Sequence, residues 1–221
     1  MIQRRNYRAC LKEHVTIEEL KKAVRIDSEI VRTAIEQKKC LTVAMYYHED
    51  MIFLYTEGLG GEADAGRLFP NVSKLLELWP QKGGKTPWVK MHTIYYHAIP
   101  EDEKAWTRQG KKIRRGRIAY LKEDKLFSYT YYHKAIVDEG LLEGDKYQFI
   151  ALHEDILFSY FEEPKQLTHI KKDIHEESKV IKEWLAVDPE SHFDHTLSGE
   201  ENFLLLPEVF SMGLEDSMEN Q

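Results

Sequence analysis

The sequence predicts an α+β protein built from two similar halves, and three observations lead to that fold class. Residues 48–57 recur at 153–162 with six identical positions, and the offset of 105 residues is about half of the 221-residue chain. The same order of strand and helix patterns surrounds each copy. The apolar share of 42% and the charged share of 31% are ordinary for a folded protein. The chain can therefore form one large core or two smaller ones.

After an opening strand, the first half continues with a helix and a hairpin. Thr16 has the features of a helix N-cap, with Glu19 three residues later and apolar residues at helical spacing behind it. Apolar and aromatic runs at 41–47 and 51–55 lie on both sides of a short polar break, which predicts two antiparallel strands. His48 then lies in the turn, so we interpret it as a turn residue rather than a catalytic one.

A second helix and a last strand complete the first half. Apolar residues at 72–79 predict a helix that ends at Pro80. Residues 88–97 are dense in β-branched and aromatic side chains, which is typical of a strand. The predicted order of the first half is therefore β-α-β-β-α-β.

The second half repeats this order. We predict its opening strand at 118–121, its first helix at 126–137, its hairpin at 149–152 and 156–161, and its last strand at 203–210. Its second helix is predicted from apolar residues at helical spacing, namely Leu167, Ile170, Ile174, Ile181 and Trp184.

The first helix of the second half has an alternative reading. Residues 123–129 resemble the hairpin segment 154–160, so that 126–132 could form a strand. A helix is favoured because large side chains recur on one helical face, at Leu126, Tyr129, His133 and Ile136.

A β-α-β-β-α-β unit is the ferredoxin-like arrangement, an antiparallel sheet with both helices on one face. Two tandem halves can pack their uncovered sheet faces together as a pseudo-dimeric α/β barrel. The predicted division is a first ferredoxin-like half at 1–98, a charged linker at 99–115, a second ferredoxin-like half at 116–211 and an acidic tail at 212–221. We expect the linker to be a solvated connector and the tail to be frayed.

Composition narrows the range of partners. The net charge of −7 provides no attraction to nucleic acid or to an anionic membrane. No stretch approaches the roughly 18 apolar residues of a membrane span, and no signal peptide is recognised, so we expect a cytoplasmic protein with no membrane partner. Cys10 and Cys40 are expected to be reduced and are too few for a thiolate metal site. The segment 192–195, with two histidines and Asp194, is interpreted as a solvated loop rather than a zinc site.

Tyr129 and His133 are the strongest candidates for chemistry. They lie four residues apart, so both side chains project from one face of the predicted helix. A histidine can accept or donate a proton near neutral pH, which makes the pair a candidate for proton transfer. The competing interpretation is an aromatic cluster that contains a hydrogen-bonded histidine.

This segment resembles a known family. Residues 121–126, Tyr129, His133, Ile136 and Glu139 are similar to the first strand and helix of the L-rhamnose mutarotase family. Residues 147–162 look like that family's central hairpin. The similarity is ungapped over about twenty residues, and the order of elements agrees over nearly the whole chain. The resemblance implies a ferredoxin-like, dimeric α/β-barrel type of fold, here as a tandem duplication.

The resemblance also implies an activity and a site. A mutarotase interconverts the anomers of a small sugar by general acid–base catalysis, through opening and closing of the sugar ring. His133 and Tyr129 match the family's catalytic histidine and tyrosine. The substrate-binding residues would be Glu139, Tyr132 and Trp184. No cofactor and no metal are implied, and the partner is a sugar-like small molecule.

The chain departs from the family pattern in two places. Residues 137–139 read Val-Asp-Glu where the family has Trp-Pro-Glu, and a single Trp184 replaces paired tryptophans. The first half has no histidine at the matching place around 20–30, so at most one of two pseudo-equivalent sites would be active. Since such families form homodimers, the fused halves would make a monomer with an intrachain pseudo-dimer, or a weak homodimer.

Two further functions stay open. The protein could be a non-catalytic small-ligand-binding or sensor protein that uses an aromatic cavity between the two predicted sheets. It could instead be a haem or monooxygenase-type barrel protein, which would need an axial histidine or a similar ligand.

Overall fold

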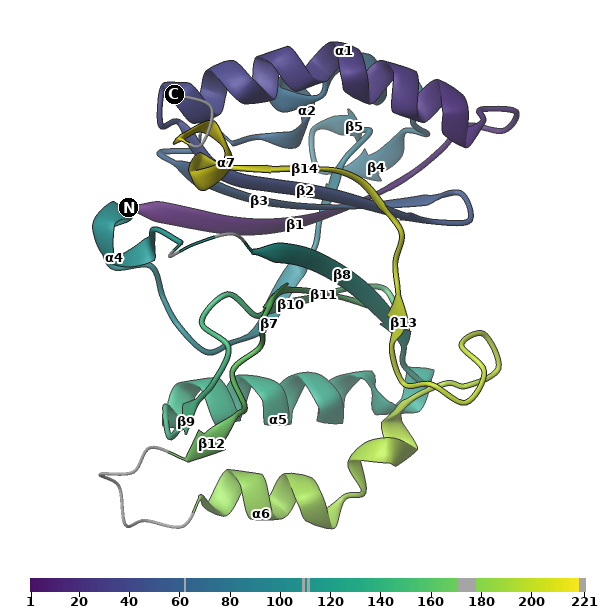
Figure 1. Cartoon of the computed structure of the whole chain (residues 1–221). Coiled ribbons are helices and arrows are strands. Elements are labelled where there is room, and N and C mark those ends of the chain that lie inside the picture. Colours follow the sequence, from purple (N-terminus) through teal and green to yellow (C-terminus); the bar gives the residue numbers. More distant parts are fainter. Residues whose placement is uncertain (62, 109, 111, 171–177, 219–221) are drawn as a thin grey trace. The chain divides into compact units, whose positions relative to one another are not determined.

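The computed structural model describes residues 1–218 except 62, 109, 111 and 171–177 (Figure 1). The predicted fold class is confirmed, because the chain forms two five-stranded antiparallel sheets, each with helices on one face. The described chain divides into two compact units. The first comprises 1–91, 100–114 and 206–221, and the second comprises 92–99 and 115–205.

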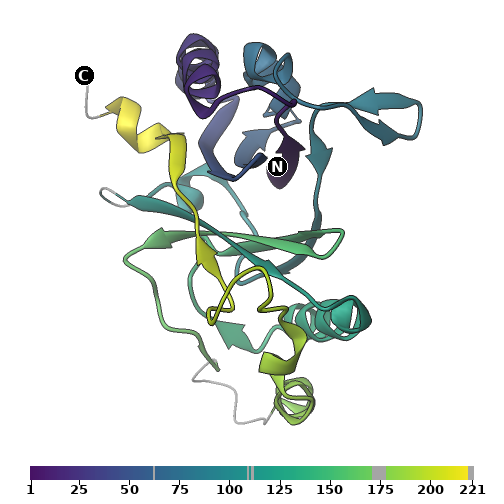
Figure 2. The same ribbon diagram turned by 90° about the vertical axis from the view of Figure 1, so that its right-hand side faces the viewer.

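The first unit contains one large sheet and most of the short helices. Its sheet has the order β14-β2-β3-β1-β6. These strands are β1 (Ile2–Cys10), β2 (Cys40–His48), β3 (Met51–Leu59), β6 (Val89–Lys90) and β14 (Glu208–Gly213). The helices are α1 (Ile17–Glu36), α2 (Ala65–Leu68), α3 (Pro70–Ser73), α4 (Glu103–Trp106) and α7 (Leu214–Met218). A separate hairpin, β4 (Trp79–Gln81) with β5 (Gly84–Thr86), projects from this unit (Figure 2).

The second unit repeats the arrangement. Its sheet has the order β13-β8-β11-β10-β7. These strands are β7 (His92–Tyr96), β8 (Ile113–Tyr120), β10 (Phe149–His153), β11 (Ile156–Glu163) and β13 (Leu204–Leu205). Its helical segments are η1 (Glu123–Lys125), α5 (Leu126–Glu139), α6 (Lys179–Ala186) and η2 (Pro189–His192). A small ladder joins β9 (Leu142–Glu143) to β12 (His169–Ile170).

The compact units do not follow the two halves of the sequence, because the last strand of each half is shared between both sheets. The strand predicted at 88–97 is interrupted at Met91: β6 pairs with β1, and β7 pairs with β10. The strand predicted at 203–210 is interrupted in the same way, so that β13 pairs with β8 and β14 with β2. In both cases the exchanged strand covers the free edge of the other half's hairpin, where unpaired main-chain groups would otherwise remain.

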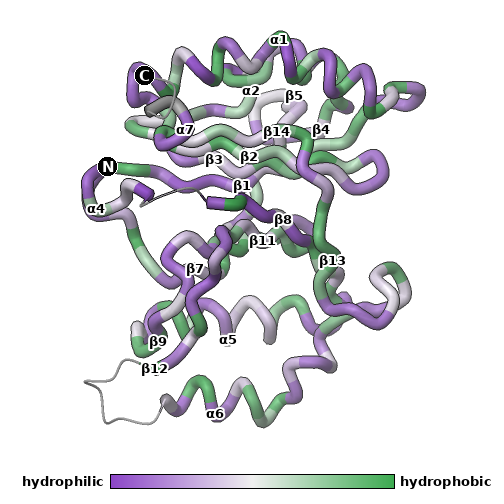
Figure 3. The backbone as a smooth tube through the Cα atoms, viewed as in Figure 1, coloured by the Kyte–Doolittle hydropathy of each residue, from purple (hydrophilic) through white to green (hydrophobic). Residues whose placement is uncertain are grey.

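Helix α1 forms as its sequence predicts. The Thr16 hydroxyl accepts a hydrogen bond from the main-chain N–H of Glu19, and the Glu19 carboxylate accepts one from the N–H of Thr16. Green and purple segments alternate along the helix (Figure 3), as expected of an amphipathic helix with one buried stripe. That stripe packs on β1–β3 in a core that includes Leu20, Val24 and Val31.

The two repeated hairpins have the same geometry. Each has a two-residue turn whose first residue, Glu49 or Glu154, adopts a positive φ of 55° or 57°. Primed turns of this kind match the twist of the strands that they connect. The carbonyls of Asp50 and Asp155 accept equivalent hydrogen bonds of 2.8 Å from the N–H groups of Leu11 and Leu121, which directly follow β1 and β8. The internal repeat is therefore a repeat of backbone conformation.

The prediction of a helix over 126–137 is confirmed, since α5 spans Leu126–Glu139 and ends at Gly140, whose φ of 67° closes the helix. The helix predicted over 72–79 is wrong beyond Ser73. The buried carboxylate of Asp27 accepts the main-chain N–H groups of Asn71 and Val72, which fixes a single turn, α3, against α1.

The second helix of the second half begins later than predicted. Leu167 precedes β12 and Ile170 lies in it, while Ile174 falls outside the described residues. Helix α6 begins after Ser178, whose hydroxyl accepts the N–H of Ile181 and supplies the N-cap. The predicted residues Ile181 and Trp184 do lie in this helix.

The predictions of a solvated connector at 99–115 and a frayed tail at 212–221 are both wrong. Within 99–115, α4 buries Trp106, and the side chains of Arg108 and Arg114 are almost fully buried. Arg114 forms ion pairs with Glu215 and Asp216 of α7, so the tail is structured through residue 218, while 219–221 lie outside the described residues. Charged segments can be buried in this way where each charge has a partner.

Candidate active site

The predicted pair Tyr129 and His133 lies in an aromatic cluster of the second unit. Their rings stack with centroids 3.9 Å apart and an interplanar angle of 18°. Trp184 of α6 contacts both rings edge-on, at 5.1 Å from His133 and 5.6 Å from Tyr129. Tyr95 of β7 contacts His133 at 5.4 Å. The i, i+4 spacing on α5 therefore brings the pair together, and α6 and β7 enclose it.

His133 has a defined proton arrangement. Its Nδ1 lies 3.0 Å from the main-chain carbonyl of Tyr129, and a carbonyl can only accept, so Nδ1 carries the hydrogen. In the neutral ring, Nε2 then carries the lone pair, and no side chain in the described part of the unit hydrogen-bonds to it. Burial lowers the pKa of His133 to about 4, against the effect of the Tyr129 carbonyl and with a further lowering from His192. His133 is therefore a neutral acceptor at pH 7.

The protonation state of Tyr129 is complementary to that of His133. It is buried, and burial raises the pKa of its phenol above the ordinary value, while Arg117 acts in the opposite direction. The hydroxyl therefore stays protonated at neutral pH and can donate a hydrogen bond. The rings of the pair stack, and no hydrogen bond joins the Tyr129 hydroxyl to the imidazole within the described structure.

Of the remaining predicted site residues, Tyr132 lies at the aromatic cluster and Glu139 does not. Tyr132 contacts Trp184 at 5.5 Å and so borders the cluster. Glu139, at the end of α5, accepts a hydrogen bond from the hydroxyl of Ser178, the N-cap of α6. Glu139 thus ties the two helices together, and no contact with Tyr129 or His133 is described for it.

His192 joins the cluster, although its segment was interpreted as a solvated loop. It is fully buried, 4.8 Å from Trp184 and 6.0 Å from Tyr129 between ring centroids. The hydroxyl of Ser128 lies 2.8 Å from its Nε2, and the carbonyl of Asp188 lies 3.2 Å from its Nδ1. The apolar Phe193 beside it was the sequence signal that this segment packs inward.

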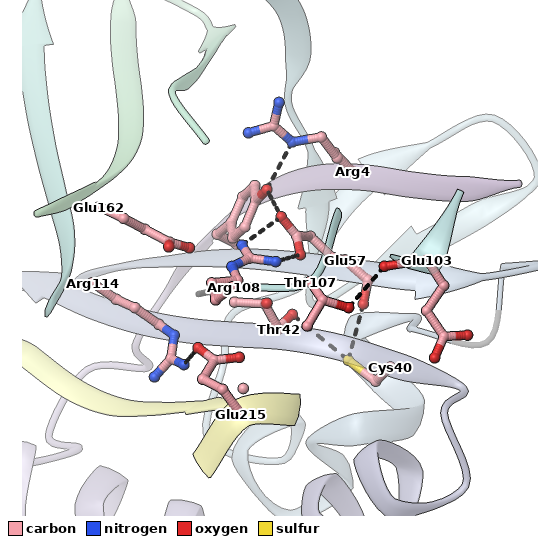
Figure 4. A network of polar contacts seen from close by, with 12 residues as sticks. Arg4, Cys40, Thr42, Glu57, Glu103, Thr107, Arg108, Arg114, Glu162 and Glu215 are labelled. Carbon is pink, nitrogen blue, oxygen red and sulfur yellow. Dashed lines mark hydrogen bonds and ion pairs between the residues drawn. The ribbon is translucent and has the colours of Figure 1, made fainter. Parts of the chain in front are cut away.

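The first unit contains a separate buried polar network (Figure 4). The guanidinium of Arg108 donates two hydrogen bonds to Glu57, of 2.6 and 2.9 Å. The Tyr55 hydroxyl donates to Glu57 at 2.5 Å and accepts from Arg4 at 2.7 Å. Burial favours the neutral form of Glu57, but Arg108, Arg4 and Tyr55 outweigh it and hold the pKa of Glu57 at about 2.

This network recurs in part in the second unit. The Tyr160 hydroxyl donates to Glu162 at 2.6 Å, as Tyr55 does to Glu57. These residues occupy the last three positions of the ten-residue repeat, where tyrosine and glutamate are identical in both copies. The repeat therefore carried a signal for buried polar groups at its tyrosine and glutamate. Its histidines, His48 and His153, are the last residues of β2 and β10, directly before the turns and not in them as predicted.

The described ranges contain neither a candidate metal site nor a candidate membrane-spanning helix. No group of three or more His, Cys, Asp or Glu side chains is placed to hold a metal ion there. None of the described helices combines the length and the apolar character that are needed to cross a membrane.

Comparisons with known proteins give distant similarities of fold. No protein-family model matches the chain, and no curated protein matches it. Among solved structures, a provisionally assigned monooxygenase from Lactobacillus acidophilus NCFM is 10% identical, with 96% of each chain covered and a TM-score of 0.43. A mutant chlorite dismutase from Candidatus Nitrospira defluvii is 12% identical over 98% of this chain and 94% of that chain, with a TM-score of 0.38. An anthrone oxidase-like protein is 9% identical over 97% of both chains, with a TM-score of 0.36. At these values the similarities assign no activity to the chain.

Proposed function

We propose that the Tyr129–His133 site interconverts the anomers of a small reducing sugar by general acid–base catalysis. The observation that carries the proposal is the complementary state of the two side chains. His133 presents a neutral nitrogen with a lone pair, and Tyr129 keeps its phenolic proton. One acceptor and one donor in a single stacked pair are what ring opening of a cyclic hemiacetal requires.

The proposed reaction conserves protons over the cycle. His133 Nε2 takes the proton of the anomeric hydroxyl, while the Tyr129 hydroxyl gives its proton to the ring oxygen. The bond between C1 and the ring oxygen breaks, and the C1 carbonyl forms. After rotation about the C1–C2 bond, the hydroxyl attacks the other face of the carbonyl, Tyr129 regains its proton, and the imidazolium returns its proton to O1.

The aromatic surroundings suit such a substrate. In this proposal the apolar C–H surface of the sugar packs against the rings of Trp184 and Tyr132, which border the pair, and Tyr95 contacts His133 from β7. The same rings exclude water from the imidazole, which lowers its pKa and makes it a weaker base. General acid–base groups of this kind contribute roughly 10²–10⁴-fold to a rate.

The test is saturation-transfer NMR of α-to-β exchange with neutral and acidic reducing sugars. We expect exchange above the spontaneous rate with the wild type, and loss of that enhancement in His133→Ala and Tyr129→Phe. Exchange should be constant between pH 5.5 and 8 and should fall with a midpoint of about 4, where His133 becomes protonated. Tyr131→Phe, on the exposed face of α5, is the matched control and should keep full activity.

Other outcomes would favour the alternatives. If no sugar exchanges faster than it does without protein, while a sugar still binds equally to wild type and His133→Ala, the ligand-binding or sensor function replaces the isomerase. A Soret absorption band in the purified protein would favour a haem-type function.

A further inference from the structure

A second group of polar side chains lies on the helix-covered face of the second sheet, and the proton-transfer scheme does not use it. Ala119 of β8 and Leu157 of β11 belong to the core cluster that contains Tyr129. Arg117 and Ser159 lie two residues from them along the same strands, so their side chains point to the same face. The Nε of Arg117 donates a hydrogen bond of 3.4 Å to the Ser159 hydroxyl.

Arg117 is a desolvated cation without a carboxylate partner in the described part of the chain. Its guanidinium lies 4.1 Å from the Phe203 ring and 5.2 Å from the Phe161 ring. Burial lowers the pKa of Arg117. By contrast, Arg115, two residues earlier on the same face, pairs with Glu163 at 3.1 Å. The bond to Ser159 uses one of five guanidinium N–H donors, and the others are available to a ligand.

Lys165 brings a second cation to the same place. Its Nζ lies 4.3 Å from the Phe161 ring, so one aromatic side chain contacts both cations. Burial lowers the pKa of Lys165, and the charge of Arg117 lowers it further, against opposing effects of Asp145 and Glu163. Neither carboxylate lies within ion-pair distance of Lys165. Two like charges at one site repel each other, and an anion placed between them would relieve that repulsion.

This cationic group adjoins the candidate active site. Phe203, which contacts Arg117, also contacts Phe193 at 5.7 Å, and Phe193 contacts Tyr129 at 5.8 Å. Arg117 and Tyr129 also act on each other electrostatically, since each shifts the pKa of the other.

We propose that Arg117, Lys165 and Ser159 bind the anionic group of the substrate, so that the site takes aldoses that carry a carboxylate or a phosphate. A guanidinium fork matches either group, and a lysine and a hydroxyl add further donors. A neutral sugar would leave both cations without an anion. The assignment of a substrate rests on the proposed function, while the anion site rests on its own geometry.

The test measures binding separately from exchange. Wild type is titrated with glucuronate, glucose 6-phosphate, inorganic phosphate and glucose, and affinity is measured by calorimetry at low and high salt. We expect at least one acidic sugar to bind at least tenfold more tightly than glucose, with weaker binding at high salt. The preference between glucuronate and glucose 6-phosphate identifies the anionic group.

Variants locate the site. Arg117→Gln should weaken binding of the acidic sugar at least tenfold and leave the affinity for glucose unchanged. Lys165→Gln should weaken binding several-fold. Arg115→Gln, on the same sheet face but already paired, is the matched control and should change it by less than twofold. Arg117→Lys, which keeps the charge, should retain part of the affinity, and circular dichroism shows whether each variant is folded.

Failure of this inference is distinguishable from failure of the proposed function. Equal affinity of wild type and folded Arg117→Gln for acidic sugars, or equal affinity of wild type for glucose and both acidic sugars, overturns the anion site. Anion binding that needs Arg117 but is accompanied by no exchange supports the anion site and overturns the mutarotase. Exchange above the spontaneous rate in the wild type, together with equal affinity of wild type and folded Arg117→Gln for the acidic sugars, supports the mutarotase and overturns the anion site.

Discussion

The main-chain carbonyl of Tyr129 determines which nitrogen of His133 can react. The sequence predicts that the two side chains share a helical face, and the structure adds that the imidazole turns back to its own helix. That contact could not be predicted from spacing, because a histidine four residues after a tyrosine can equally bond to the phenol. The same limit applies to His192, whose burial depends on how a distant loop folds onto α5.

Glu57 and Arg108 form the most deeply buried ion pair described, with side chains 0% and 2% exposed. Glu57→Gln leaves the guanidinium buried with a weakened partner, so we expect the free energy of unfolding at pH 7 to fall by about 3 kcal/mol. Urea denaturation measures it. Glu103→Gln, at the exposed pair with Lys38, is the matched control and should cost less than about 1 kcal/mol.

The pH dependence of this pair has a defined sign. The pKa of Glu57 in the folded protein is about 2, below the ordinary 4.5, so its contribution to stability is present above pH 4.5 and is lost as pH falls toward 2. The difference in stability between wild type and Glu57→Gln should therefore narrow over that range. A difference that stays constant from pH 7 to pH 2.5 would contradict the pairing.

At the scale of elements, a cap helps to predict where a helix begins only when the spacing of the apolar residues agrees with it. The capping residues Thr16 and Glu19 fix the start of α1. Ser178 caps α6 equally well, but the apolar residues Leu167 and Ile170 at helical spacing obscured that start. Periodicity alone therefore placed the helix about ten residues too early.

The cap of α1 gives a direct prediction. Thr16→Ala removes the hydroxyl that accepts the Glu19 N–H and should lower the free energy of unfolding by about 1 kcal/mol. Thermal and urea unfolding measure the change. Thr33→Ala, at an exposed position inside α1, is the control, and it should be neutral or slightly stabilising, because alanine favours a helix. Equal losses in both variants would show that the cap does not contribute.

At the scale of the molecule, the sequence predicts the order of the long strands but not which sheet receives each one, and it misses the short pairs β4–β5 and β9–β12. A pattern at 88–97 or 203–210 indicates an extended segment, while its partner is chosen by contacts far away in the chain. The exchange at Met91 and at Leu206–Pro207 is therefore a property of tertiary structure. Residue spacing predicts the candidate site only where its residues share one helix, whereas Trp184 of α6 was identified through the family resemblance.

Because each sheet contains a strand from the other sequence half, we expect the two units to unfold together. Three of the four tryptophans, at positions 79, 88 and 106, lie in the first unit, and Trp184 lies in the second. In Trp184→Phe, tryptophan fluorescence reports on the first unit alone, while far-ultraviolet circular dichroism reports on both. The two signals should have the same urea midpoint. A second transition seen only by circular dichroism would show that the units unfold independently.

The exchanged strands also constrain how such a gene can change. In a chain of two independent modules, recombination can replace one half without regard to the other. Here β7 is encoded with the first half but completes the second sheet, and β14 is encoded at the end of the second half but completes the first. If recombination replaced one half, the new sequence would have to preserve both the pairing of β14 with β2 and the pairing of β7 with β10. The two copies of the ancestral repeat can therefore diverge in their loops and sites, but they are inherited as one unit.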